Sequence, residues 1–169
     1  MKIGLIAVFF AQLAWITFLP VFQTPDEQAH FGQVNVVAVT GQDYIPPSNL
    51  SKEIYIAEDI LGTLRNSRGD NKYTYHPEFN IEYSNNLYGF KEKEIISFPK
   101  SFRTDFLINE STAYPPLYYR LGSFFNIGTF FDRVFAVRLL TGLIGILTFV
   151  VVYLVGKILY KEPLKQISL

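Results

Sequence analysis

Residues 3–22 form an apolar stretch, IGLIAVFFAQLAWITFLPVF. Residues 24–31, which follow after Gln23, read TPDEQAHF and carry ionisable side chains. The first stretch matches the roughly 20 apolar residues that a helix needs to cross about 30 Å of hydrocarbon. Lys2 gives the positive start of a signal peptide, but the apolar region of a signal peptide spans only about 7–15 residues. We therefore predict a retained transmembrane helix over residues 1–22. Asp26 would then lie roughly 6 Å beyond the hydrocarbon edge, at the depth of lipid phosphates.

A second apolar stretch, residues 139–156, carries no charged side chain and is rich in Leu, Ile, Val and Phe. With its flanks it predicts a transmembrane helix over residues 133–159, followed by a cytoplasmic tail over residues 160–169. Aspartate is a preferred residue at helix N-termini, so we expect Asp132 to be the N-cap of this helix.

The basic residues near the two stretches predict the orientation. Lys2 precedes the first stretch, and three lysines follow the second: Lys157, Lys161 and Lys165. The connecting loop, residues 23–138, is long enough that its own charges have little influence on topology. We predict an integral protein of a bacterial-type inner or plasma membrane, with both termini cytoplasmic and the loop extracytoplasmic.

The composition fits a membrane protein with a large polar loop, because 49% of residues are hydrophobic, 17% aromatic and 18% charged, with zero net charge. No basic stripe is present, so nucleic acid is not expected as a partner. The chain has no cysteine. This excludes disulfides and cysteine-based metal or nucleophile chemistry.

The loop divides into three zones that differ in residue composition. Residues 23–40 predict a short helix that carries the Asp-Glu motif and ends at Gly41. Residues 41–113 are typical of an irregular, aromatic-rich insertion, with short strand candidates at residues 72–76 and 94–98.

The last zone, residues 114–131, predicts an amphipathic helix that lies in the membrane interface. Three of its apolar side chains fall at i, i+4 and i+7, namely Leu117, Leu121 and Phe124. Such a helix would bring Tyr118 and Arg120 to the same depth as Asp26. We expect this helix and the helix over residues 23–40 to flank one cavity.

The ionisable residues after the first apolar stretch form a candidate site. Asp26 and Glu27 lie four and three residues before His30, so all three can share one helix face. Carboxylates beside a histidine suit acid–base catalysis and can also hold a divalent metal ion. Acidic residues at a helix start also stabilise the helix dipole by about 0.3–1 kcal/mol. His30 can orient a carboxylate, ligate a metal ion or be satisfied at the interface, and the residues alone leave these roles open.

Three short motifs gain meaning from their order along the chain. Residues 25–31 read PDEQAHF, residues 114–119 read YPPLYY, and residues 138–140 read RLL. In this order they resemble the amino-terminal part of multi-pass C-type glycosyltransferases. The resemblance is to bacterial families akin to protein O-mannosyltransferases and the aminoarabinose transferase of lipid A, with a P-D-E-x-x-H-F signature. It covers both ends of the chain and hardly touches residues 43–113.

The resemblance implies transfer of a sugar from a polyprenyl-phosphate donor on the extracytoplasmic face. An acidic residue of the first external loop is the catalytic base in such families, which carries over onto Asp26, with Glu27 as its neighbour and His30 in support. The residues expected to bind donor phosphate or lipid headgroups are Tyr118, Arg120, Arg133 and Arg138. No cofactor is implied with certainty, and a divalent metal ion is a candidate.

Such transferases have many spans, whereas this chain has two apolar stretches and stops at Leu169. The expected fold class is therefore a mainly α membrane protein. Two transmembrane helices flank a long extracytoplasmic loop with short interfacial helices, as a fragment of a larger helical bundle that is inactive alone. The remaining transmembrane helices would be its partners. Gly142 and Gly145 either face those absent helices or reflect the abundance of glycine in membrane helices.

A two-span receptor or sensor with an external binding loop fits the same topology, and a partner subunit of a larger membrane protein is a third alternative. Against the receptor, residues 41–113 lack long amphipathic helices or alternating strands. We therefore expect that the loop does not bury a core of its own.

Overall fold

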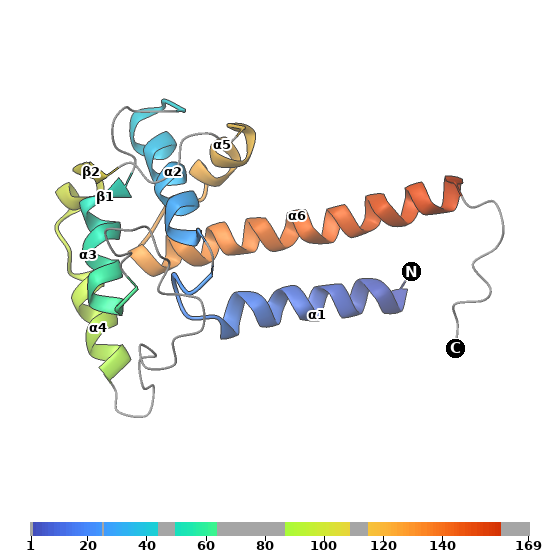
Figure 1. Ribbon diagram of the computed structural model, residues 1–169, viewed down its shortest axis with the longest axis horizontal. Helices are drawn as coiled ribbons and strands as arrows, with labels where there is room; N and C mark the ends of the chain where they lie inside the picture. Colours follow the sequence, from blue (N-terminus) through green and yellow to red (C-terminus); the bar gives the residue numbers. More distant parts are fainter. Residues whose placement is uncertain (1, 25, 44–49, 64–86, 109–114, 160–169) are drawn as a thin grey trace. The chain divides into compact units, whose positions relative to one another are not determined.

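The computed structural model describes residues 2–24, 26–43, 50–63, 87–108 and 115–159. Over these residues the chain is mostly helical, as predicted, with one two-stranded sheet (Figure 1). The chain divides into two compact units, which are described separately. Unit 1 comprises Met1–Leu19 and Arg138–Leu169, and unit 2 comprises Pro20–Val137.

The two apolar stretches form helices of unequal length, α1 over Lys2–Phe18 and α6 over Phe130–Leu159. Among the described residues, α6 is the one helix long and apolar enough to cross a membrane, with 30 residues. The 17 residues of α1 span about 25 Å, less than the roughly 30 Å of hydrocarbon. The structure therefore shows one candidate span, and the second predicted span is not shown.

The end of α1 differs from the prediction, because the helix stops at Phe18 and does not continue to residue 22. Pro20 has no N–H to donate to the helix and disfavours helical geometry at Leu19. The chain leaves the helix at this point and turns into unit 2.

Within unit 1, α1 packs against glycines of α6. A Cβ atom on Gly142 would lie 2.9 Å from Ile16 Cδ1, and one on Gly145 would lie 2.9 Å from Gln12 Nε2. The missing side chains therefore allow close helix contact. The expectation that this glycine surface faces helices outside the chain is corrected, since α1 occupies it.

The start of α6 also differs from the prediction, since the helix begins at Phe130 rather than at residue 133. The Thr129 backbone N–H donates to Asp132 Oδ2 at 2.9 Å, and the Asp132 backbone N–H donates to Thr129 Oγ1 at 3.3 Å. This reciprocal pair is a capping box, with Thr129 at the N-cap and Asp132 at the third helical position. The prediction of Asp132 as the N-cap is therefore wrong.

In unit 2, α2 over Glu27–Thr40 packs against α5 over Leu117–Ser123. Gly41 ends α2 in the left-handed conformation, with φ 69°, and its N–H donates to the carbonyl of Val37 at 2.9 Å. α5 has only seven residues. A single helix over residues 114–131 is therefore wrong, because the chain turns after Ser123 through Gly128, whose φ is 93°.

The middle of the loop is more regular than predicted. It contains β1 over Leu50–Ser51, α3 over Lys52–Leu61, α4 over Leu87–Ile96, a 3-10 helix over Lys100–Arg103 and β2 over Phe106–Ile108. β1 pairs antiparallel with β2. The irregular insertion is therefore wrong for these residues. The strand predicted at residues 94–98 is also wrong, because residues 94–96 belong to α4, which is rich in good helix formers. The other strand candidate, residues 72–76, lies outside the described residues.

α3 has sequence signals at both ends. Its N-cap is Ser51, whose hydroxyl accepts from the Ile54 N–H at 3.4 Å, and its C-cap is Gly62, with φ 72°. Ile54, Ala57 and Leu61 recur at helical spacing and are buried. These signals predict a helix, although the flanking aromatic residues obscure them.

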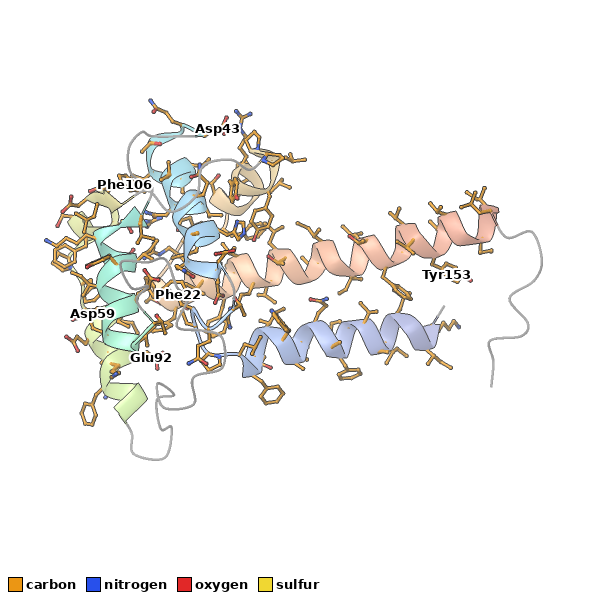
Figure 2. The ribbon with its side chains drawn as sticks, viewed as in Figure 1. Phe22, Asp43, Asp59, Glu92, Phe106 and Tyr153 are labelled. Carbon is orange, nitrogen blue, oxygen red and sulfur yellow. The ribbon has the colours of Figure 1, made fainter. Side chains whose placement is uncertain are left out.

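Unit 2 has its own hydrophobic core, which corrects the expectation that the loop buries none. Phe22, Phe31 and Phe130 meet at its centre, with Phe130 in edge-on contact with each of the other two rings at 5.7 Å (Figure 2 labels Phe22). Side chains from α2, α3, α4 and α5 complete the core: Val34, Val37, Ile54, Ala57, Leu61, Ile95 and Tyr119.

We predict that Gly122→Ala destabilises unit 2. The added Cβ would lie 2.8 Å from Val34 Cγ2, and Val34 is fully buried between α2 and α5. Overpacking of this kind costs about 1–3 kcal/mol. Urea unfolding in detergent, followed by circular dichroism, measures the loss.

Gly89→Ala is the matched control, because a Cβ there meets nothing within 4 Å. That change should be neutral or stabilising by up to about 1 kcal/mol, since alanine favours helices over glycine. Equal effects of the two variants would contradict close packing at Gly122.

Candidate functional site

The turn that leads into α2 is held in an unusual backbone conformation. Phe22 and Asp26 both have positive φ, at 61° and 60°. The Glu27 carboxylate accepts from the Phe22 backbone N–H at 2.8 Å, which closes the turn between α1 and α2. Positive φ in residues other than glycine costs about 1–3 kcal/mol and tends to occur at functional sites. Glu27 therefore has a structural partner that maintains this turn.

Asp26 differs from its neighbour. It is the N-cap residue of α2, and its carbonyl accepts from the His30 N–H at 3.0 Å, but its carboxylate makes no capping hydrogen bond. The side chain is exposed to solvent. The helix start thus uses the backbone of Asp26, and the carboxylate lies at the surface near the positive end of the helix dipole.

His30 lies one turn further along α2 and joins it to α5. Its Nδ1 is 2.9 Å from the hydroxyl of Tyr119, and the two rings stack with centroids 6.0 Å apart. Burial lowers the pKa of His30, and the negative charge of Asp26 partly opposes this shift. The neutral imidazole is therefore favoured at neutral pH, and Asp26, His30 and Tyr119 form one cluster.

Tyr118 and Arg120 lie beside this cluster on α5. The Tyr118 ring is partly buried and meets the Tyr119 ring edge-on at 5.4 Å. Arg120 is exposed and pairs with Asp43, not with Asp26, through two hydrogen bonds of 2.8 and 2.5 Å (Figure 2 labels Asp43). This pairing lowers the pKa of Asp43 and raises that of Arg120.

The expected convergence of Arg120 on Asp26 is therefore not seen. Asp43 is held against α2 by Gln33, whose amide donates to the Asp43 carbonyl. Gln33 lies seven residues after Asp26, which is about 10 Å along the helix axis. Arg120, on α5, is therefore paired with a carboxylate held beside the middle of α2, whereas Asp26 stands at the start of that helix.

Arg133 is buried and paired with Glu53. It could bind a phosphate, as predicted, only if the side chains around it moved. Its Nη2 donates to Glu53 Oε1 at 2.5 Å, and its guanidinium lies 5.8 Å from the ring centroids of both Phe31 and Phe130. Glu53 Oε2 and Arg133 Nη1 are buried and have no hydrogen-bond partner among the described residues. This ion pair joins α3 to the first turn of α6.

Arg138 interacts with the end of α1. Its Nη1 donates to the carbonyls of Ile16 and Leu19, at 3.2 and 2.6 Å. The last carbonyls of a helix have no partner within the helix, so a buried cation there satisfies and stabilises them. Arg138 therefore has a structural role within unit 1, in addition to its predicted one at headgroups.

Sequence reasoning missed a second buried polar group, formed by Asn35, Arg103 and Asn126. Arg103 Nε donates to Asn35 Oδ1 at 3.2 Å, and its Nη2 donates to the Asn126 carbonyl at 2.7 Å. Burial lowers the pKa of Arg103, as does the nearby charge of Arg133, while Glu53 opposes the shift. The sequence does contain one signal for this group: Asn35 is a polar residue inside the apolar run VNVVAV, and a buried polar side chain needs a hydrogen-bond partner.

A metal centre finds no support in the geometry of the described residues, where no group of three or more His, Asp or Glu side chains is arranged to hold an ion. Metal binding by Asp26, Glu27 and His30 stays a prediction.

No protein-family model, curated protein or solved structure matches this chain. The resemblance to C-type glycosyltransferases therefore rests on the three sequence motifs alone.

We predict that breaking the buried ion pair is strongly destabilising. Arg133→Met leaves the Glu53 carboxylate buried without its partner, and loss of one member of such a pair costs about 3–5 kcal/mol. The double variant Glu53→Leu with Arg133→Met should recover most of this loss, because no unpaired charge is left. Urea unfolding measures both.

Arg120→Met is the matched control, because it removes an arginine from an exposed pair. Exposed pairs contribute little, so its stability should be nearly unchanged. A small effect of Arg133→Met, similar to that of Arg120→Met, would contradict the structural role of the buried pair.

We also predict acid sensitivity at the contact between His30 and Tyr119. Folding lowers the pKa of His30 from about 6.5. Its stabilising contribution is therefore present above about pH 6.5 and is lost as the pH falls through the folded-state pKa. Thermal unfolding between about pH 7.5 and 5 should show this loss, and His30→Gln should reduce it. The control is His76→Gln at the other histidine, and an unchanged slope in His30→Gln would contradict the prediction.

Proposed function

We propose that this chain is the amino-terminal portion of an integral-membrane glycosyltransferase that moves a sugar from a polyprenyl-phosphate donor to an extracytoplasmic acceptor. In this proposal α1 and α6 both cross the membrane, the termini are cytoplasmic and unit 2 is extracytoplasmic. α1 is a few residues short of a full span, which local bilayer thinning can accommodate.

The observation that carries the proposal is the difference between Asp26 and Glu27. Glu27 closes the turn before α2, whereas the Asp26 carboxylate is exposed and does not cap the helix. A role confined to holding the turn before α2 therefore suits Glu27 better than Asp26. Asp26 is our candidate general base, and Glu27 and His30 position it.

The chemistry needs few groups. The hydroxyl oxygen of the acceptor attacks the anomeric carbon of the sugar, and the bond from that carbon to the phosphate oxygen breaks. The acceptor proton passes to the Asp26 carboxylate, and polyprenyl phosphate leaves with the electron pair of the broken bond. A cation can stabilise the departing phosphate. Of the three predicted arginines, Arg120 is the exposed one, and its exposed pair with Asp43 costs little to exchange for a phosphate.

The test is turnover in membranes that contain the protein carrying this chain. We predict that Asp26→Asn lowers release of polyprenyl phosphate from a radiolabelled polyprenyl-phosphate hexose or aminopentose by about 10²–10⁴-fold, the usual contribution of a general base. The free energy of unfolding should change by no more than about 1 kcal/mol, because the carboxylate makes no capping bond and contributes chiefly through the helix dipole.

Two further variants sharpen this test. Asp59→Asn changes an exposed carboxylate of α3 in the same unit and should leave turnover unchanged. Glu27→Gln should lower stability, since a neutral amide is a weaker acceptor for the Phe22 N–H. Full turnover in Asp26→Asn would refute the assignment of Asp26.

A membrane-anchored binding domain is the second candidate, and one observation favours it. Unit 2 buries a core of its own, as an independent ligand-binding domain must. If Asp26→Asn leaves turnover intact, or if no sugar is transferred by the protein, this candidate replaces the first.

A further inference from the structure

α5 and the turn after it present large apolar side chains to solvent. Tyr119 and Gly122 face α2 and are buried, so the helix already has a packed inner face. The outer residues are exposed, with 69% exposure at Leu117 and 76% at both Phe124 and Ile127. We name this surface the α5 patch, and it consists of Leu117, Leu121, Phe124, Phe125 and Ile127. Exposed apolar side chains gathered in one short segment of this kind are typical of a contact site.

We propose that the α5 patch inserts into the headgroup layer of the lipid bilayer. The first argument is chain continuity. Ile127 precedes Phe130, the first residue of α6, by three residues, so at most about 11 Å separates them. A helix that can cross a membrane therefore keeps the patch near the membrane surface.

The length of α6 gives the depth. Its first eight residues, 130–137, belong to unit 2, and its uncharged run, residues 139–156, spans about 27 Å, close to the roughly 30 Å of hydrocarbon. The start of α6 then lies about 13 Å above that run, near the outer edge of the headgroup layer. The α5 patch, within about 11 Å of that start, can reach back to the headgroups.

The composition of the patch fits a lipid contact. Phenylalanine and leucine lie on the exposed side, and Arg120, in its exposed pair with Asp43, lies among them in the sequence. Apolar side chains combined with a basic residue are typical of surface helices that bind at the boundary between headgroups and acyl chains. The arginine can reach the lipid phosphates while its aliphatic stem stays among the apolar groups.

The inference rests on the membrane part of the proposed function, not on sugar transfer, and fluorescence tests it directly. Trp15 is the only tryptophan, so a Trp15→Phe background allows single probes. Phe124→Trp reports on the α5 patch. Phe90→Trp on α4 is the matched control, with 68% exposure, and Val151→Trp on α6 is the membrane control. In Figure 1, α4 and α5 lie apart in unit 2.

The protein is reconstituted in vesicles of phosphatidylcholine and phosphatidylglycerol, with or without bromine near the headgroup end of the acyl chains. We expect bromine to quench Phe124→Trp about twofold more than Phe90→Trp. Val151→Trp is measured also with bromine deep in the chains and should be quenched there. Aqueous iodide should show the reverse order, quenching Phe90→Trp and sparing Phe124→Trp.

Each other outcome overturns the proposal. If Phe124→Trp behaves like Phe90→Trp, the patch has no special contact with lipid. Protection from both bromine and iodide would mean that protein covers the patch, as a further helix or a second copy would. Without quenching of Val151→Trp, α6 is not in the membrane and the premise fails. Loss of sugar transfer alone would leave the quenching pattern intact, so the two failures are distinguishable.

Discussion

The ion pair between Glu53 and Arg133 is the constraint on which unit 2 depends. It joins residues 80 positions apart and holds α3 against the first turn of α6. The Arg133 guanidinium lies 5.8 Å from the ring centroids of both Phe31 and Phe130, so the same residue contacts the aromatic centre of the core. Two buried charges are costly unless they are paired, so the elements that carry them have little freedom to separate.

This constraint explains why the helix start at Asp26 can be strained. Phe22 and Phe31 flank the turn on either side, and both are buried in the core. Positive φ at Phe22 and Asp26 persists only where the surroundings fix it. The packed rings on one side and the Glu27 hydrogen bond on the other supply that fixation. An exposed carboxylate thus stands on a rigid support, which a general base needs and a helix-dipole partner does not.

The parts of the fold that were predictable from sequence have local signals. The helix over Glu27–Thr40 was predictable because Gly41 is a typical helix end, and α6 was predictable from its uninterrupted apolar run. The ends of both apolar helices were less predictable, because Pro20 and the Thr129 capping box act within a single turn. The middle elements were missed because α3 and α4 have only ten residues each. The caps and helical spacing of α3 are local signals, whereas its packing against the 3-10 helix and its ion pair with α6 join segments remote in sequence and leave no local signal.

The candidate site was predictable as a cluster but not in its division of roles. Spacing alone groups Asp26, Glu27 and His30, yet it cannot tell which carboxylate accepts a backbone N–H. Spacing also cannot show that Arg133 and Arg138 are buried. An arginine near the start of an apolar helix is expected at the surface unless its partners are known. Glu53 and the carbonyls of α1 are those partners, and both are remote in sequence. The physical distinction between a site residue and a structural one therefore lies in hydrogen bonds that only the folded chain contains.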